Sequence, residues 1–351
     1  MIKSVQFKNF KVLRDATLPL DRFTLIVGPN GSGKSTALQA IQVIAKHSGG
    51  VPPFSAVVSA DLRSRKETTV QVILSLDSSS EGVSIAANWT SISEMLRRSK
   101  SIPDSEFVLG YHKKGEKPLS EEEMRNLREK LAHTQIFSFD SSSIAFPVQL
   151  QPTMTLNHQG GFLAGVLDRL RDQAPERFEA LNDELGQWFP EFDKILFDTP
   201  ETGQRSFLLR TRGGHYAISA TDLSQGTLLA LAILALGYLP NPPPLVGLEE
   251  PDRGIHPRLL RQIQDALYRL SYPENFGEKR DPVQVIATTH SPYFLDLYKD
   301  HPEEVVIAQK TSEGARFERL SERPDIEEIL DGAPLGEVWF SGILGGVPVE
   351  Q

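Results

Sequence analysis

The sequence predicts an α/β fold with a mostly parallel core sheet, an antiparallel β subdomain and a helical insert. An apolar strand, a glycine-rich loop and an amphipathic helix open the chain within residues 1–47. Helices and strands alternate again from about residue 221. The patterns between these two blocks are typical of antiparallel strands and helices. Because α/β order occurs at both ends, we expect one α/β domain, called the head below, whose sequence is divided by an insert.

The N-terminal block is defined by a strand and a helix on either side of the loop. Residues 23–27 form a continuous apolar run, as expected for a strand buried on both faces. After the loop, apolar side chains recur at helical spacing at Ala37, Leu38, Ile41, Ile44 and Ala45. This spacing predicts an amphipathic helix directly behind the loop.

The insert begins with strand patterns and continues with helices. Residues 70–76 alternate apolar and polar, and residues 83–86 and 107–109 follow as further strands, so we expect an antiparallel meander. Ser120 and Glu123 form a capping box that opens a charged helix reaching about Leu131. The remaining insert elements expected are helices over 162–171 and 175–188 and a hairpin of strands 207–210 and 216–218.

The C-terminal block repeats the α/β order. We expect a helix over 226–237, a strand over 245–248, a helix over 259–270 and a strand over 283–287. The expected division is therefore an N-terminal part of the head over 1–60, an insert over 61–220 and a C-terminal part over 221–351.

Composition excludes several classes of protein. The chain has 351 residues, a net charge of −9 and no cysteine, so disulfides, thiol nucleophiles and cysteine-based metal sites are excluded. The apolar run over 228–239 is too short to span a bilayer, and residues 1–8 alternate like a strand, so we expect a cytoplasmic protein without a membrane partner. We interpret the short basic groups at 63–66, 97–100 and 113–114 first as solvated loop charges, and DNA stays open as a ligand.

Residues 28–35 match the phosphate-binding loop G-x-x-x-x-G-K-[ST] at every position. Backbone N–H groups and the helix N-terminus would face the phosphates of ATP. Lys34 would hold the β- and γ-phosphates, and the Ser35 hydroxyl would bind Mg²⁺. The residues assigned to the nucleotide here are Gly28, Asn30, Gly31, Ser32, Gly33, Lys34, Ser35 and Thr36.

Three further segments have the character of a nucleotide site. The strand over 245–248 ends in two carboxylates, of which we assign Glu249 to Mg²⁺ and Glu250 to the attacking water; plain solvated charge is the alternative. Ser224 and Gly226 open an apolar helix whose N-terminus could bind an anion, or Ser224 could be an ordinary cap. His290 follows the end of the strand over 283–287, where a structural or surface histidine is the alternative.

These four motifs occur in the order found in ABC ATPases, and their details resemble the SMC/RecF-like branch. Residues 2–11 are similar to its "N-F-[KR]" opening strand, and residues 249–257 to its "EEPE-x-x-x-HP" extension. The resemblance implies that Lys11 contacts the nucleotide and that His290 senses the γ-phosphate. Glu249 and Asp252 depart from the usual Asp and Glu. The glutamine of the Q-loop stays open between Gln71, Gln135 and Gln149.

The chain resembles the compact bacterial AAA-type members of this class, with weaker similarity at residues 160–167 and 335–340. The insert between Lys34 and Ser224 is too short for a long coiled coil. No metal-site pattern follows His290, so we expect no TOPRIM nuclease.

The resemblance implies an ATP-hydrolysing switch that closes as a head-to-head homodimer, with a higher oligomer left open. In such a dimer, Ser224 and Gly226 serve the partner's ATP. Members of this type act as sensors or regulators in bacterial anti-phage defence or in DNA repair, beside an effector such as a nuclease or toxin encoded nearby. A transporter's nucleotide-binding subunit is the alternative, although the long insert argues against it. A scaffold that binds ATP without turnover is the third hypothesis.

Overall fold

The structure is a computed structural model that describes residues 1–49, 69–76, 83–91, 105–113, 119–214, 216–312 and 314–345. The chain forms two compact units, one of residues 1–134 and 286–351 and the other of residues 135–285. The division expected at residues 60 and 220 separates motifs rather than compact units, and it stays a prediction. The basic groups at 63–66 and 97–100, and Lys114 of the third group, lie outside the described residues.

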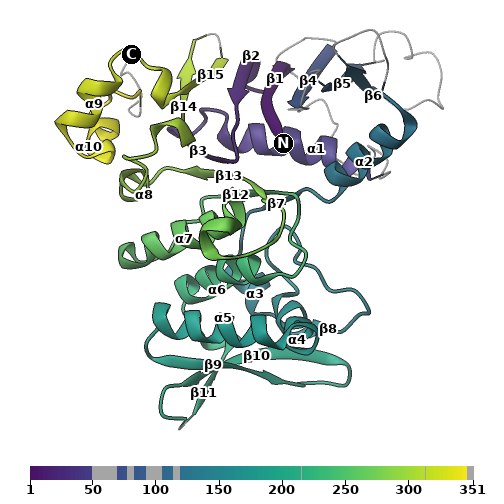
Figure 1. The fold of residues 1–351 in the computed structure, drawn as a ribbon, viewed down its shortest axis with the longest axis vertical. Helices are drawn as coiled ribbons and strands as arrows, with labels where there is room; N and C mark the ends of the chain where they lie inside the picture. Colours follow the sequence, from purple (N-terminus) through teal and green to yellow (C-terminus); the bar gives the residue numbers. More distant parts are fainter. Residues whose placement is uncertain are drawn as a thin grey trace. The chain divides into compact units, whose positions relative to one another are not determined.

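The first unit contains the N-terminal strands and the C-terminal tail (Figure 1). Its strands are β1 (Ile2–Phe10), β2 (Leu13–Pro19), β3 (Phe23–Val27), β4 (Thr69–Leu76), β5 (Val83–Ser91), β6 (Ser105–Lys113), β14 (Val305–Thr311) and β15 (Gly314–Arg319). Its helices are α1 (Lys34–Ser48), α2 (Glu121–Ala132), α8 (Pro292–Asp296), α9 (Ile326–Gly332) and α10 (Leu335–Phe340). Strand β13 (Gln284–Thr289) crosses the boundary and belongs to this unit from Ile286 onward.

An antiparallel sheet with the order β2-β1-β4-β5-β6 forms one part of the first unit. β4 pairs with β5 and β5 pairs with β6, both antiparallel, so the predicted meander is confirmed. On β4, Val70, Val72 and Leu74 are fully buried and their neighbours are half-buried. Buried and half-buried residues thus alternate with a period of two, which is the pattern that predicts this strand from the sequence.

The strand in front of the phosphate loop lies in a second, largely parallel arrangement. β3 is buried at all five positions, as its apolar run predicted. β14 pairs parallel to β3, with Val305 opposite Leu25, while β13 lies on the other side of β3. β15 then closes this edge by pairing antiparallel with β14. The long-range parallel pairing of β3 with β14 therefore fixes the base of the loop.

The second unit is built from helices over a small sheet. Its strands are β7 (Gln135–Phe137), β8 (Val148–Gln149), β9 (Phe192–Asp198), β10 (Gln204–Thr211), β11 (Ala217–Ser219) and β12 (Leu245–Glu249). Its helices are α3 (Ser141–Ala145), α4 (Leu163–Gln173), α5 (Pro175–Trp188), α6 (Gln225–Tyr238) and α7 (Leu260–Ser271). β12 pairs parallel to β7, and α5 packs against β9 (Figure 1).

The predicted helices of the chain are confirmed within a few residues. The Ser120–Glu123 capping box is present in full at the start of α2. Helix α5 spans the predicted Pro175–Trp188, and α6 is buried from Thr227 to Tyr238. The hairpin of β10 and β11 is also confirmed.

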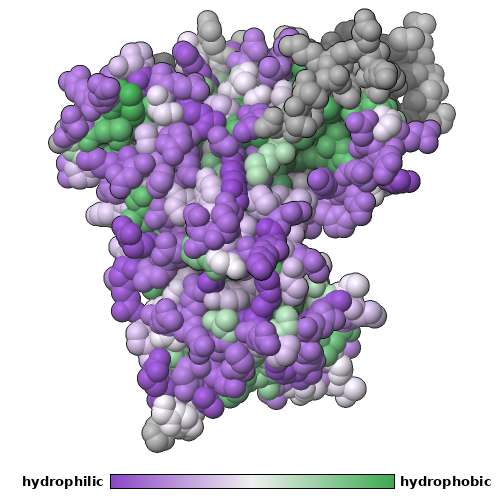
Figure 2. All heavy atoms as spheres, in the orientation of Figure 1, coloured by the Kyte–Doolittle hydropathy of each residue, from purple (hydrophilic) through white to green (hydrophobic). Residues whose placement is uncertain are grey.

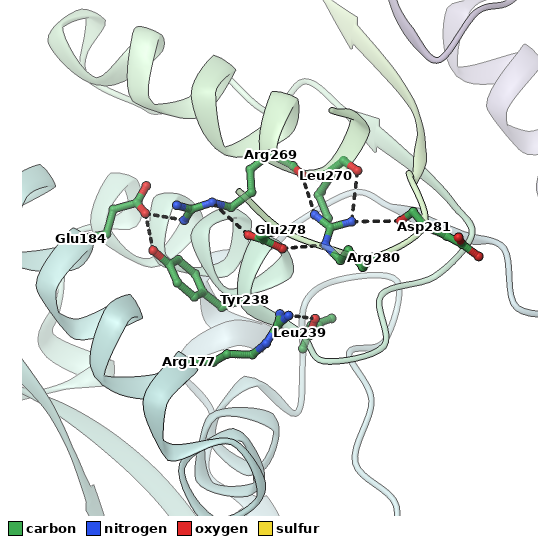
Figure 3. A network of polar contacts seen from close by, with 9 residues as sticks. All are labelled: Arg177, Glu184, Tyr238, Leu239, Arg269, Leu270, Glu278, Arg280 and Asp281. Carbon is green, nitrogen blue, oxygen red and sulfur yellow. Dashed lines mark hydrogen bonds and ion pairs between the residues drawn. The ribbon is translucent and has the colours of Figure 1, made fainter. Parts of the chain in front are cut away.

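A polar network joins three helices of the second unit at one end (Figure 3). Arg269 of α7 donates to the Glu184 carboxylate of α5 at 2.6 Å and lies 3.3 Å from the Glu278 carboxylate. Tyr238, at the end of α6, donates its phenol hydrogen to the same Glu184, and burial raises the pKa of this phenol. The Arg269 guanidinium also lies over the Tyr238 ring, 4.7 Å from its centroid. Because each charge has a partner, the network can remain partly buried.

Hydrophilic residues cover most of the described surface on the face shown in Figure 2. Among the described residues, no helix is both long and apolar enough to cross a bilayer.

Candidate phosphate-binding site and its companion motifs

The phosphate loop presents the start of helix α1. The helix begins at Lys34, directly after Gly33 with a φ of 95°, and Gly31 also has a positive φ of 75°. Glycine tolerates this left-handed conformation, which lets the loop turn its backbone N–H groups inward. No side chain of the described residues caps α1, and its first turn has no acidic residue. The positive end of the helix is therefore suited to an anion.

The loop is held against two neighbouring strands at very short range. A Cβ atom added to Gly28 would lie 2.2 Å from the carbonyl oxygen of Ala308 on β14. A Cβ atom on Gly33 would lie 2.7 Å from Cδ2 of Leu13 on β2. No larger residue fits at Gly28 without moving the β14 backbone. The glycine spacing in this loop thus reflects packing against β14 and β2 as well as room for a ligand.

Lys34 is buried at the centre of the loop, with 5% of its surface exposed. Its ammonium group donates to the carbonyl oxygens of Gly28 at 2.7 Å and Pro29 at 3.0 Å. Nδ1 of His290 lies 3.3 Å from the same ammonium group and 2.9 Å from the Gly28 oxygen. The structure therefore brings together two of the predicted site residues, one from each end of the chain.

The other residues assigned to this loop differ in exposure. Ser32 is fully buried, and its hydroxyl has no hydrogen-bond partner among the described residues. Asn30 and Ser35 are exposed and Thr36 is half-buried. Lys11 lies in the turn between β1 and β2 with a φ of 53°, and its ammonium group donates to Oε1 of Gln39 on α1 at 2.6 Å. Lys11 is thus held beside α1 by a side chain of that helix.

The paired carboxylates end strand β12 in the second unit. Glu249 is the last residue of β12, and both Glu249 and Glu250 are half-buried. Glu250 has a φ of 48°, a left-handed conformation that is rare for a residue with a side chain. The turn behind it is closed by the Arg253 N–H, which donates to the Glu250 carbonyl at 3.0 Å. Such conformations concentrate at functional sites, where the surrounding structure holds them.

Sequence reasoning missed Arg253 in this turn. Its guanidinium donates to the carbonyl oxygen of Phe139 at 3.1 Å, which ties the turn to the segment after β7. An arginine in an exposed turn gives no local signal for this bond, because its partner is more than one hundred residues away in the chain.

Ser224 and Gly226 open helix α6 in the second unit. The Ser224 hydroxyl accepts from the Thr227 N–H at 3.1 Å, so Ser224 is an N-cap of its own helix. A Cβ atom on Gly226 would lie 2.7 Å from the carbonyl oxygen of Gly254, in the turn that follows the two carboxylates. Only this end of α6 is open to solvent, because Ser224 and Gln225 are exposed.

The three glutamines left open by the sequence lie on different strands. Gln71 is on β4, Gln135 on β7 and Gln149 on β8. Gln135 pairs with Val246 of β12 at the start of the parallel ladder, away from the end that carries Glu249. Within the described ranges, no cluster of three or more histidine, cysteine, aspartate or glutamate side chains could hold a metal ion.

Comparisons with known proteins give one family match and several matches to solved structures. The family described as "AAA domain, putative AbiEii toxin, Type IV TA system" matches residues 23–296. A crystal structure of an SmcHead bound to the C-winged helix domain of ScpA superposes with a TM-score of 0.60 at 16% identity, over 93% of this chain and 99% of that one. A structure of the recombination mediator RecF gives a TM-score of 0.48 at 11% identity, over 91% and 98% of the two chains.

A shorter match concerns a curated protein. The OLD nuclease of Thermus scotoductus (strain ATCC 700910 / SA-01) is 54% identical over 44 residues, which is 12% of this chain and 8% of that nuclease. The chain thus matches only a small part of that protein. The SmcHead superposition covers nearly the whole chain and confirms the predicted ABC-type α/β fold. Since the family match spans most of the sequence, including the phosphate loop and the paired carboxylates, the chain belongs to this AAA-domain family.

Proposed function

We propose that the chain binds ATP with Mg²⁺ and hydrolyses it as a switch. The observation that carries this proposal is the loop around Lys34, where a buried ammonium group, an uncapped helix start and His290 face one another. An ammonium group that donates to carbonyl oxygens and lies beside a histidine can exchange these partners for phosphate oxygens. Anions are the ligands that such a helix start favours.

The residues of the loop fit a nucleoside triphosphate and its metal ion. The backbone at Gly31 has room for a ligand beside it, because an added Cβ atom would meet nothing within 4 Å. The Ser35 hydroxyl is exposed, and the buried Ser32 hydroxyl has no hydrogen-bond partner among the described residues, so both oxygen atoms are available to a ligand. Mg²⁺ would be held by Ser35 and Glu249 together with phosphate and water, and when bound it neutralises charge on the phosphates.

The roles of the other residues rest on the order of the motifs and on the family. Lys34 binds the β- and γ-phosphates, and His290 contacts the γ-phosphate. Glu250 accepts a proton from the attacking water, which its carboxylate can do as a general base. Gly28, Asn30, Gly31, Ser32, Gly33 and Thr36 line the phosphates, and Lys11 contacts the nucleotide from the β1–β2 turn.

The switch is proposed to close between two copies of the chain. The exposed start of α6, with Ser224 and Gly226, supplies N–H groups to the ATP held by the partner copy. Binding of ATP then favours a homodimer, and hydrolysis releases it. The remainder of α6 is buried, which gives this helix start a rigid support.

The process served by the switch is proposed to be anti-phage defence or DNA repair, as a cytoplasmic sensor or regulator. The family description names a toxin of a type IV toxin–antitoxin system, and the short match to an OLD nuclease points in the same direction. We further propose an effector such as a nuclease or toxin encoded nearby, with DNA as a candidate ligand. Genome context and co-purification of the neighbouring product test this part.

The experiment that tests the ATPase itself is phosphate release by the purified chain with MgATP, compared with Lys34→Ala. We expect turnover by the natural chain and none by Lys34→Ala, since the phosphates lose their cation. ATP binding without phosphate release at any protein concentration would support the scaffold hypothesis instead.

A further inference from the structure

Two short helices of the first unit hold each other beside His290. Helix α8 begins two residues after His290, and α10 comes from the C-terminal tail and packs against α8 (Figure 1). The family match ends at residue 296, so α10 lies outside it. The tail helix is therefore not explained by the family motifs.

The contact between α8 and α10 is closer than any side chain would allow. A Cβ atom on Gly336 of α10 would lie 2.6 Å from the carbonyl oxygen of Pro292 and 2.7 Å from its Cβ atom. The N–H of the same Gly336 donates to Oδ1 of Asp296 at 2.7 Å. Gly336 thus contacts both the first and the last residue of α8. Leu335 and Trp339 are buried on either side and anchor α10.

The first turn of α8 is joined to the end of β13 by two hydrogen bonds. The Ser291 N–H donates to the Thr289 hydroxyl at 2.9 Å, and the Ser291 hydroxyl accepts from the Phe294 N–H at 3.2 Å. His290 lies between Thr289 and Ser291 in the chain, and its Nδ1 is 2.9 Å from the Gly28 carbonyl oxygen. Any displacement of α8 is therefore expected to move the His290 ring relative to the phosphate loop.

We infer that Gly336 and Asp296 are positioning residues that hold His290 against the phosphate loop. They act through α8, which they hold by the Gly336–Asp296 hydrogen bond and the close approach of Gly336 to Pro292. The effect on ATP turnover rests on the proposed function, whereas the placement of the His290 ring does not. The two parts can be tested separately in the full-length chain.

The ring placement is tested by NMR of the imidazole nitrogens in the nucleotide-free protein, with the His290 signal assigned from a His290→Ala spectrum. We expect Asp296→Ala and Gly336→Ala to shift this signal. Asp296→Asn keeps an oxygen acceptor for Gly336 and should leave the signal in place. Asp300→Ala removes an exposed carboxylate four residues further on and serves as the matched control. An unchanged His290 signal in folded Asp296→Ala would overturn the inference, and this series still decides it if Gly336→Ala does not fold.

The consequence for turnover is tested by steady-state kinetics. Asp296→Ala should lower kcat roughly tenfold or more, because a small misplacement of a catalytic group is costly, while KM for ATP stays within about twofold. In a His290→Ala background the same change should have no further effect. An equal loss in both backgrounds, or in Asp296→Asn, would show a general structural role. If the natural chain has no turnover, the proposed function fails while the NMR signal still decides the positioning.

Discussion

The ammonium group of Lys34 lies 3.3 Å from Nδ1 of His290, although the two residues are 256 positions apart in the chain. Both groups also contact the carbonyl oxygen of Gly28, at 2.7 and 2.9 Å. The end of β13 therefore meets the start of α1 at the phosphate loop. A histidine in this place can respond to whatever the lysine binds, and this relationship underlies the proposed switch.

Glu250→Gln should separate ATP binding from ATP hydrolysis. The amide keeps the shape of the side chain but cannot accept the proton of the attacking water, so we expect turnover to fall about 100-fold or more. Binding of ATP, measured by calorimetry, should stay close to that of the natural chain, in contrast to Lys34→Ala. Equal loss of ATP binding in both variants would remove Glu250 from its assigned role.

Gly226→Ala should destabilise the start of α6. The added methyl would lie 2.7 Å from the Gly254 carbonyl oxygen, so backbone has to move. Gly237→Ala, in the same helix, brings a methyl to 3.4 Å from Cδ of Arg269, an ordinary van der Waals contact, and should be neutral or stabilising by about 0.5–1 kcal/mol. Thermal unfolding of the two variants checks the contrast. A Gly226→Ala variant with the Tm of the natural chain would contradict the close approach of these two turns.

Arg269→Met should be costly because it leaves two carboxylates without their shared partner (Figure 3). Glu184 keeps Tyr238 and Glu278 keeps Arg280, so the expected cost is about 1–3 kcal/mol and not that of a fully unpaired buried charge. Lys3→Met removes an exposed pair with Asp21, whose side chains are 45% and 50% exposed, and should cost less than about 1 kcal/mol. The free energy of unfolding in urea measures both. Similar values for the two variants would show that the network of Arg269 adds little.

His47 should make the stability of the first unit depend on pH. Burial lowers the pKa of this imidazole, whose Nδ1 lies 2.8 Å from the Val43 carbonyl oxygen on α1. As the pH falls through the ordinary histidine pKa of about 6.5, the unfolded chain takes up a proton that the folded chain resists. The contribution of His47 to the free energy of unfolding is therefore present above that pH. It is lost progressively as the pH falls from there to the lowered pKa of the folded state.

The measurement for His47 is urea unfolding at about pH 7.5 and about pH 5.5. His47→Gln should lose less free energy of unfolding between the two pH values than the natural chain does. His133→Gln, in which an exposed histidine is replaced, is the control and should behave like the natural chain. A drop in His47→Gln as large as that of the natural chain would exclude this contribution.

Much of the fold could be predicted because its signals are local. The buried run of β3, the capping box of α2 and the apolar face of α7 each lie within one short segment. The pairing of β14 with β3 has no such signal, because it joins segments nearly 280 residues apart. The apolar run Val305–Ala308 could have indicated a strand, but not its neighbour.

The candidate site was predictable where a motif names the residue and not where packing decides. The spacing of the glycines identified the loop around Lys34, yet the approach of Ala308 to Gly28 depends on β14. The positive φ of Glu250 belongs to the turn that the Arg253 N–H closes, and a glutamate at this position does not predict such a backbone conformation. Local chemistry therefore located the loop, while the tertiary contacts that hold it required the structure.

The most direct test of the proposed switch is the ATPase rate of a mixture of two inactive variants. Ser224→Arg blocks the start of α6 but keeps Lys34 and Ser35, whereas Lys34→Ala keeps the start of α6. If each ATP is shared between two copies, a mixed dimer has one site damaged twice and one site intact. We predict that phosphate release returns on mixing and rises with protein concentration. A mixture that stays inactive, from chains that remain monomeric with bound ATP, would contradict the shared site and leave Ser224 as an ordinary helix cap.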